Sequence, residues 1–196
     1  MDSMDHEWSR TAGSAGSGFD FVSWGRKNGF HFFSALNSEW DDVREIPEDI
    51  LRLDPPGDYI RFYEEYDGGE CPLDFLFGGR GHSLVLYPLC MHREKSRQLL
   101  DDVIRLQIKW ENWYPGLEEQ VKEALDEALI VGEASFRGSI VFLRGKFFLA
   151  RHMELIGAFG TPSNTENILA CGDADGSFYG ILRKAVGMDP EQGECI

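Results

Sequence analysis

The chain has 196 residues, enough for one hydrophobic core, and its 42% hydrophobic content with 14 Phe, 6 Tyr and 5 Trp indicates a globular protein. Asp and Glu number 34 against 19 Lys and Arg, so the formal net charge is −15. This charge disfavours direct binding to nucleic acid and favours a protein partner with a basic face. Neither a signal peptide nor an apolar run of the ~20 residues that span a bilayer is found, so we expect an intracellular protein without a membrane segment.

By composition the chain divides into a short tail, one folded domain and a second short tail. Residues 1–18 are polar and end in a Gly- and Ser-rich run. Such a run buries too little apolar surface to offset the entropy lost on ordering, so we expect a flexible tail. The aromatic residues begin at Phe19, which predicts a single domain over 19–188 and a C-terminal tail over 189–196.

The N-terminal part of the domain predicts two helices followed by two strands. Pro47 suits a first helical turn and the acidic residues after it suit the positive helix end, so a short helix is expected to close before Pro55. A second helix is expected over Asp58–Tyr66, with a tyrosine face and a stop at Gly68-Gly69. Two strands joined by a Gly-rich loop are expected next, over Leu73–Phe77 and Ser83–Leu89.

The longest helical pattern predicts an αα-hairpin in the middle of the chain. Its first helix is expected over Lys95–Trp113, with an inward stripe of Leu99, Val103, Leu106 and Trp110 that is widened by Leu100, Ile104 and Ile108. The second helix is expected to begin at Pro115 and to end at Gly132. Its outer face carries carboxylates that are either solvated surface or a site for a basic partner: Glu118, Glu119, Glu123, Asp126 and Glu127.

The clearest β-hairpin pattern follows, with strands expected over Ser139–Leu143 and Phe147–Ala150 and a tight turn at Arg144-Gly145. Both runs are continuously apolar, which predicts strands covered on both faces at the centre of the sheet. Two further strands are expected over Asn167–Cys171 and Ser177–Leu182, with a turn at Asp175-Gly176. The expected fold class is therefore a single α+β domain, with a mostly antiparallel sheet, a central hairpin and a packed αα-hairpin.

No motif for a reaction, a metal or a cofactor is present in the sequence. The four cysteines form no Cys-x-x-Cys pair, and none of the five histidines lies in a nucleophile or zinc-protease motif. The acidic loop at Asp173 lacks the glycine and the bidentate glutamate of a calcium-binding EF-hand. We therefore expect a binding protein rather than an enzyme, with no metal and no cofactor, and the oligomeric state is left open.

Two ordered stretches resemble the adenovirus early-region-four family of about thirty-four kilodaltons, which consists of viral adaptors. The stretches are Gly29-Phe30 with Trp40-Asp41-x-Val43, Glu48 and Ile50-Leu51, and then Val141-Phe142-x-Arg144-Gly145-Lys146 through Gly157. The resemblance implies an early accessory protein in the host cytoplasm or nucleus that engages host proteins. Members of that family recruit a ubiquitin ligase through a Leu-x-x-x-Cys box, and Leu86 and Cys90 have this spacing. Pro88 between them favours a strand over the helix that such a box needs.

Two other stretches resemble different classes of protein. The segment Pro55–Phe62 through Gly68-Gly69 is similar to the opening of the SUKH immunity proteins, which are acidic α+β domains that neutralise toxins by direct binding. Tyr59–Tyr66 followed by Leu84–Pro88 resembles the start of a FemAB-like acyltransferase. The first of these resemblances implies a toxin as the partner, and the second implies a fragment of an enzyme.

Overall fold

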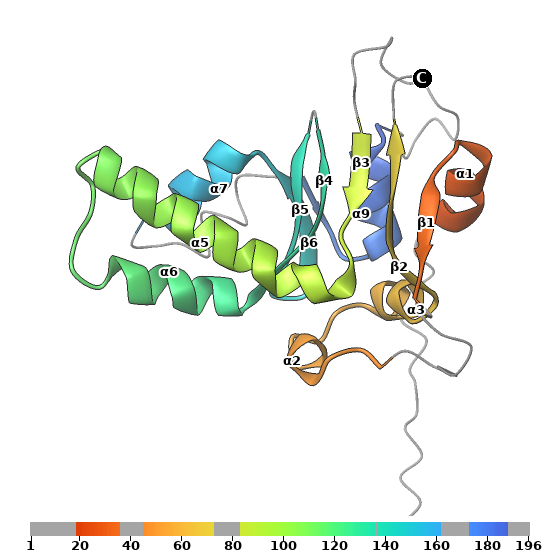
Figure 1. The fold of residues 1–196 in the computed structure, drawn as a ribbon, viewed down its shortest axis with the longest axis horizontal. Coiled ribbons are helices and arrows are strands. Elements are labelled where there is room, and N and C mark those ends of the chain that lie inside the picture. The colour runs from red at the N-terminus through yellow and green to blue at the C-terminus, as the bar shows by residue number, and fades with distance from the viewer. Residues whose placement is uncertain (1–18, 36–44, 73–82, 136, 162–172, 188–196) are drawn as a thin grey trace, which may run out of the picture.

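A single antiparallel sheet organises the molecule (Figure 1). The structure is a computed structural model that describes residues 19–35, 45–72, 83–135, 137–161 and 173–187. Within these ranges each strand pairs with its neighbour in the chain, so the sheet has the simple order β1-β2-β3-β4-β5-β6-β7. The strands are β1 His31–Ser34, β2 Tyr66–Pro72, β3 Ser83–Leu86, β4 Ala128–Ala134, β5 Gly138–Leu143, β6 Lys146–Ala150 and β7 Asp173–Asp175.

The helices cover the two faces of this sheet in separate groups. One core cluster joins the sheet to α1 Phe21–Lys27, α2 Glu48–Leu51, α3 Gly57–Glu65 and α9 Phe178–Ala185. The other cluster lies under α5 His92–Lys109, α6 Leu117–Asp126 and α7 His152–Phe159, which Figure 1 shows together on one side of β4, β5 and β6. The α+β class with an antiparallel sheet is confirmed, and so is the packing of α5 against α6.

The central hairpin is confirmed in position, turn and burial. Arg144 and Gly145 both have positive φ angles, of 48° and 78°, as a two-residue type I′ turn requires. Phe142 faces the cluster under α3 and α9 while Val141 faces the cluster under α5 and α7, and both side chains are fully buried. The continuous apolar run is therefore explained by helices on both faces of β5.

The second helix of the αα-hairpin is shorter than expected. We expected it to continue to Gly132, but α6 ends at Asp126 and β4 begins at Ala128. In β4, Leu129 and Val131 point into one core cluster while Ala128 and Ile130 point into the other. An apolar run buried on both faces satisfies helical and strand periodicity alike, and here the pairing with β5 decides for the strand.

The helix expected over Asp58–Tyr66 is confirmed as α3, but Gly68-Gly69 does not stop it, because α3 ends at Glu65 and runs directly into β2. Both glycines lie within β2 and have positive φ angles. A Cβ atom at Gly68 would collide with the backbone of Leu86, and one at Gly69 would collide with that of His31. These glycines therefore allow close strand pairing rather than ending a helix. The expected strand at 73–77 and the loop after it lie outside the described residues.

The prediction for the C-terminal segment is also wrong, because a helix replaces an expected strand. The segment expected to be a strand at Ser177–Leu182 is helix α9, whose N-cap is Ser177, with its hydroxyl accepting a hydrogen bond from the Gly180 N–H at 2.9 Å. Asp173–Asp175, expected to enter a turn, is the edge strand β7. The short helix after Pro47 is confirmed as α2. The strand expected at 167–171 and the two tails at 1–18 and 189–196 lie outside the described residues.

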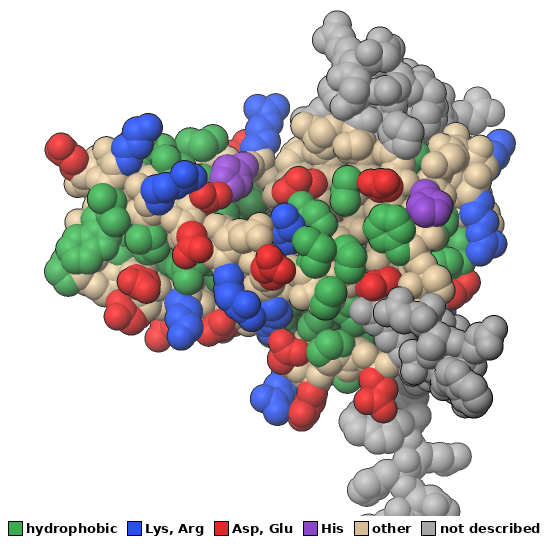
Figure 2. Space-filling model, viewed as in Figure 1, with side chains coloured by type: hydrophobic (Ala, Val, Ile, Leu, Met, Phe, Trp, Pro, Cys, Tyr) green, Lys and Arg blue, Asp and Glu red, His purple; other side chains and the backbone are tan. Residues whose placement is uncertain are grey.

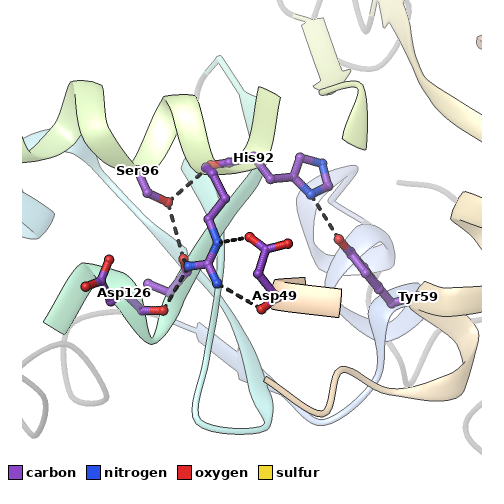
Figure 3. Close-up of polar contacts among 7 residues, drawn as sticks. Asp49, Tyr59, His92, Ser96 and Asp126 are labelled. Atoms are coloured by element: carbon purple, nitrogen blue, oxygen red, sulfur yellow. Dashed lines mark hydrogen bonds and ion pairs between the residues drawn. The ribbon is translucent and has the colours of Figure 1, made fainter. Parts of the chain in front are cut away.

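Two consecutive residues at the start of α5 fix this helix to the rest of the fold (Figure 3). His92 is fully buried, and its Nδ1 lies 2.9 Å from the Tyr59 hydroxyl of α3. Its Nε2 lies 3.1 Å from the Tyr87 carbonyl oxygen, which can only accept, so Nε2 carries the proton and donates. Arg93 donates to the carbonyl oxygens of Asp49 and Asp126 at 3.0 and 2.8 Å. The N-terminal end of α5 is therefore anchored to α2, α3 and the end of α6.

None of the helices within the described ranges is long and apolar enough to cross a membrane.

Candidate protein-binding surface

The structure does not present Leu86 and Cys90 together. Leu86 lies in β3, with no exposed surface, and points into the core cluster under α3. Cys90 is exposed in the single 3₁₀ turn η1, Leu89–Met91, that precedes α5. A box of the kind that the resemblance implies needs both side chains accessible to one partner, but a partner that approaches exposed Cys90 does not reach buried Leu86.

The carboxylates predicted on the outer face of α6 are all exposed, but they divide into two groups. At the C-terminal end, Glu127 pairs with Arg144 at 3.1 Å and the backbone of Asp126 holds Arg93. At the N-terminal end, Glu118 and Glu119 lie in the first helical turn, where the helix dipole favours negative charge. Glu123 lies one turn after Glu119. Within the described part of the chain, the carboxylates of Glu118, Glu119 and Glu123 make no ion pair, and at the other end only Glu127 makes one, since Asp126 holds Arg93 through its backbone carbonyl oxygen.

The connection between α5 and α6 carries two tryptophans that the sequence analysis did not select as site residues. Trp110 is 41% exposed and Trp113 is 51% exposed. Trp110 was expected in the inward stripe of the helix, and this expectation is wrong because α5 ends at Lys109 and Trp110 is its C-cap. In Figure 2 hydrophobic side chains gather at the end of the molecule where Figure 1 places the α5–α6 connection, with acidic side chains beside them.

Local contacts tie the connection to both of its flanking helices. Gly116 caps α6 with a φ angle of 93°, which allows the chain to turn back towards α5. The Tyr114 hydroxyl donates to Oε1 of Gln120 at 2.6 Å, and the Asn112 N–H donates to the Gln107 carbonyl oxygen at 2.9 Å. Leu117 is fully buried against the core. The two exposed tryptophans therefore lie in a turn that is hydrogen-bonded to both flanking helices.

We call Trp110, Trp113, Glu118, Glu119 and Glu123 the tip surface. Tryptophan is among the residues most enriched at the energetic centres of protein interfaces, because it offers a large and rigid apolar area. An indole face also attracts the cationic groups of Lys and Arg, and neighbouring carboxylates pair with the same groups. The tip surface is thus suited to a protein segment that combines apolar and basic side chains.

Two buried polar side chains, His92 and Tyr87, have their partners within the protein. His92 has no exposed surface, and both of its ring nitrogens are occupied by Tyr59, Tyr63 and the Tyr87 backbone, so no substrate reaches it. Burial raises the pKa of the Tyr87 hydroxyl, and a hydrogen bond to Glu133 raises it further. Across the described residues, no group of three or more His, Cys, Asp or Glu side chains converges as a metal site would require.

Searches of protein-family models, curated protein sequences and solved structures find no match to this chain.

Proposed function

We propose that this chain is a non-enzymatic protein-binding domain that neutralises a basic partner protein by direct contact at the tip surface. The observation that carries the proposal is the exposure of Trp110 and Trp113, at 41% and 51%, beside the acidic start of α6. Large aromatic side chains contribute most to binding when a partner covers them. The net charge of −15 adds a long-range attraction for a basic partner and accelerates its association.

Direct neutralisation is favoured over recruitment of a ubiquitin ligase by the positions of Leu86 and Cys90. An inhibitor of the immunity-protein type needs only one accessible surface that blocks its target. An adaptor of the viral type needs a second accessible surface for the ligase, and the residues proposed for it are split between the core and an exposed turn. The resemblance of Pro55–Phe62 and Gly68-Gly69 to the opening of the SUKH immunity proteins points the same way.

The decisive experiment compares partner capture by the wild-type chain and by the variant Trp110→Ala/Trp113→Ala. Captured proteins are identified, the basic ones are purified, and their affinities are measured by calorimetry between about 50 and 500 mM salt. We expect the double substitution to weaken binding by about 1,000-fold, because a tryptophan at the energetic centre of an interface contributes about 2 kcal/mol or more and about 1.4 kcal/mol is a factor of ten. We also expect affinity to fall as salt rises, and to fall less steeply in Glu118→Gln/Glu119→Gln/Glu123→Gln.

Leu51→Ala is the matched control, because Leu51 is 47% exposed on α2 and lies outside the tip surface. If the tryptophan double variant binds as tightly as Leu51→Ala, the tip surface is not the interface. A captured protein whose activity is unaffected by saturating amounts of this chain would refute neutralisation. Recovery of ubiquitin-ligase subunits that depends on Cys90 would favour the adaptor function instead.

A further inference from the structure

An apolar stripe on α5 borders the tip surface at Glu118 and keeps part of its surface exposed. Leu100 and Ile104 are only partly buried and Ile108 is 56% exposed, although all three were expected to widen the buried face of this helix. They are spaced four residues apart and line a shallow groove of about 380 Å³ together with Asp101, Arg105 and Glu118. In Figure 2 hydrophobic, acidic and basic side chains are mixed over the part of the molecule where Figure 1 places α5.

The charges in this groove do not suit a partner of one sign. Arg105 opposes a basic partner, while Asp101 and Glu118 oppose an acidic one. Arg105 is 73% exposed at its side chain and reaches Asp102 on its own helix at 2.6 Å. Its guanidinium has further N–H donors, so it can bind a second carboxylate without giving up Asp102.

The groove does suit a second copy of itself. If two α5 helices pack antiparallel around a two-fold axis at Ile104, Leu100 of each copy lies opposite Ile108 of the other, and the two Ile104 side chains meet at the axis. Asp101 precedes the axis by about 4.5 Å along the helix and Arg105 follows it by about 1.5 Å, given a rise of about 1.5 Å per residue. Reversal of the second helix therefore brings its Arg105 within about 3 Å, measured along the helix axis, of Asp101 on the same flank.

We propose that this chain forms a two-fold symmetric homodimer through the α5 stripe, with reciprocal ion pairs between Asp101 of each copy and Arg105 of the other. The contact is isologous, as a closed two-fold dimer requires. It extends over about three helical turns, so it is at the small end of specific interfaces and we expect a weak dimer with a dissociation constant of about 1–100 µM. The proposal does not rest on the proposed function: Glu118 is the one tip-surface residue that lines the groove, and the dimer's ion pairs use Asp101 and Arg105 instead.

Sedimentation velocity of the full chain between about 1 and 500 µM, in about 150 mM salt, tests the proposal. We expect the wild-type chain to pass from monomer to dimer over this range. Asp101→Arg creates two Arg–Arg contacts across the axis and Arg105→Asp creates two Asp–Asp contacts, so each should weaken the dimer by about tenfold or more. An equimolar mixture of the two variants restores both ion pairs and should dimerise as well as the wild-type chain, as should the double variant Asp101→Arg/Arg105→Asp.

Controls separate this interface from other causes of association. Arg52→Asp reverses an exposed charge at the C-cap of α2 and should leave the dimer unchanged, while Ile108→Asp should abolish it. Circular dichroism spectra and thermal melts of each variant verify that the fold is retained. A wild-type chain that stays monomeric at 500 µM overturns the proposal. So does a dimer that forms equally well in each single charge variant, or a mixture of the two variants that associates no better than either alone.

Discussion

Replacing Arg93 by Met tests whether this residue anchors α5, as its contacts indicate. The guanidinium donates to Asp49 Oδ2 at 3.1 Å and to the carbonyl oxygens of Asp49, Asp126 and Ala128 at 3.0, 2.8 and 3.3 Å. Met keeps the apolar stem and removes every donor. Hydrogen bonds to a charged group contribute about 1.5–3 kcal/mol each when buried, but water can replace the lost donor at the exposed carbonyl groups.

We therefore expect Arg93→Met to lower the free energy of unfolding by about 2 kcal/mol, with a fall in Tm of about 4–8 °C. Arg52→Met is the matched control, since its ion pair with Glu48 has side chains 72% and 81% exposed. Such an exposed pair contributes at most about 0.5 kcal/mol. The assay is urea unfolding followed by circular dichroism. Equal losses of stability in the two variants would refute the anchoring role of Arg93.

Three further predictions concern the core, the thiols and the first helix. Phe142→Ala should cost about 3–5 kcal/mol in urea unfolding, because Phe142 is fully buried, and a loss below about 1 kcal/mol would contradict its central position. A thiol reagent should modify exposed Cys90 rapidly in the folded protein and spare Cys71, whose pKa is raised by burial, as peptide mapping can show; equal rates would contradict this. Asp20 caps the N-terminus of α1, and the hydrogen bonds from Ser23 lower the pKa of its carboxyl group. The charged cap therefore stabilises the fold fully above the unfolded pKa of about 3.9. This stabilisation is lost as the pH falls through the pKa that Asp20 has in the folded protein, which is lower. Asp20→Ala should cost about 1 kcal/mol at pH 7, and an equal cost at pH 2 would show that the carboxylate charge is unimportant.

The candidate site could be predicted only in part from the sequence. The carboxylates at the start of α6 were selected from their run of charge, and they lie on an exposed face. Trp110 and Ile108 were assigned to the interior, although they are 41% and 56% exposed. The sequence did indicate that some of these apolar residues are exposed, because the positions expected to face inwards covered more of the helix surface than one neighbouring layer can bury. An excess of apolar positions indicates that the helix has a second apolar face, but it does not show which of the two faces packs against the core.

The features that the sequence determined by itself are those set by local backbone geometry. Gly145 permits the positive φ of a two-residue turn, which defined the central hairpin, and proline with acidic residues marked the start of α2. Such signals act over a few residues and need no other part of the chain.

The tertiary structure decided the elements for which two local patterns competed. The run at Ala128–Ala134 became a strand because β3 and β5 pair with it, although its start had been assigned to a helix. The segment Phe178–Ala185 became a helix because it packs its apolar face against α3 and β6. Gly68 and Gly69 permit strand pairing because the backbone at the end of β3 lies against Gly68 and that of β1 lies against Gly69, where a Cβ atom would collide. These outcomes depend on contacts between residues far apart in the chain, and the free energy of those contacts exceeds the small local preferences that a sequence pattern reports.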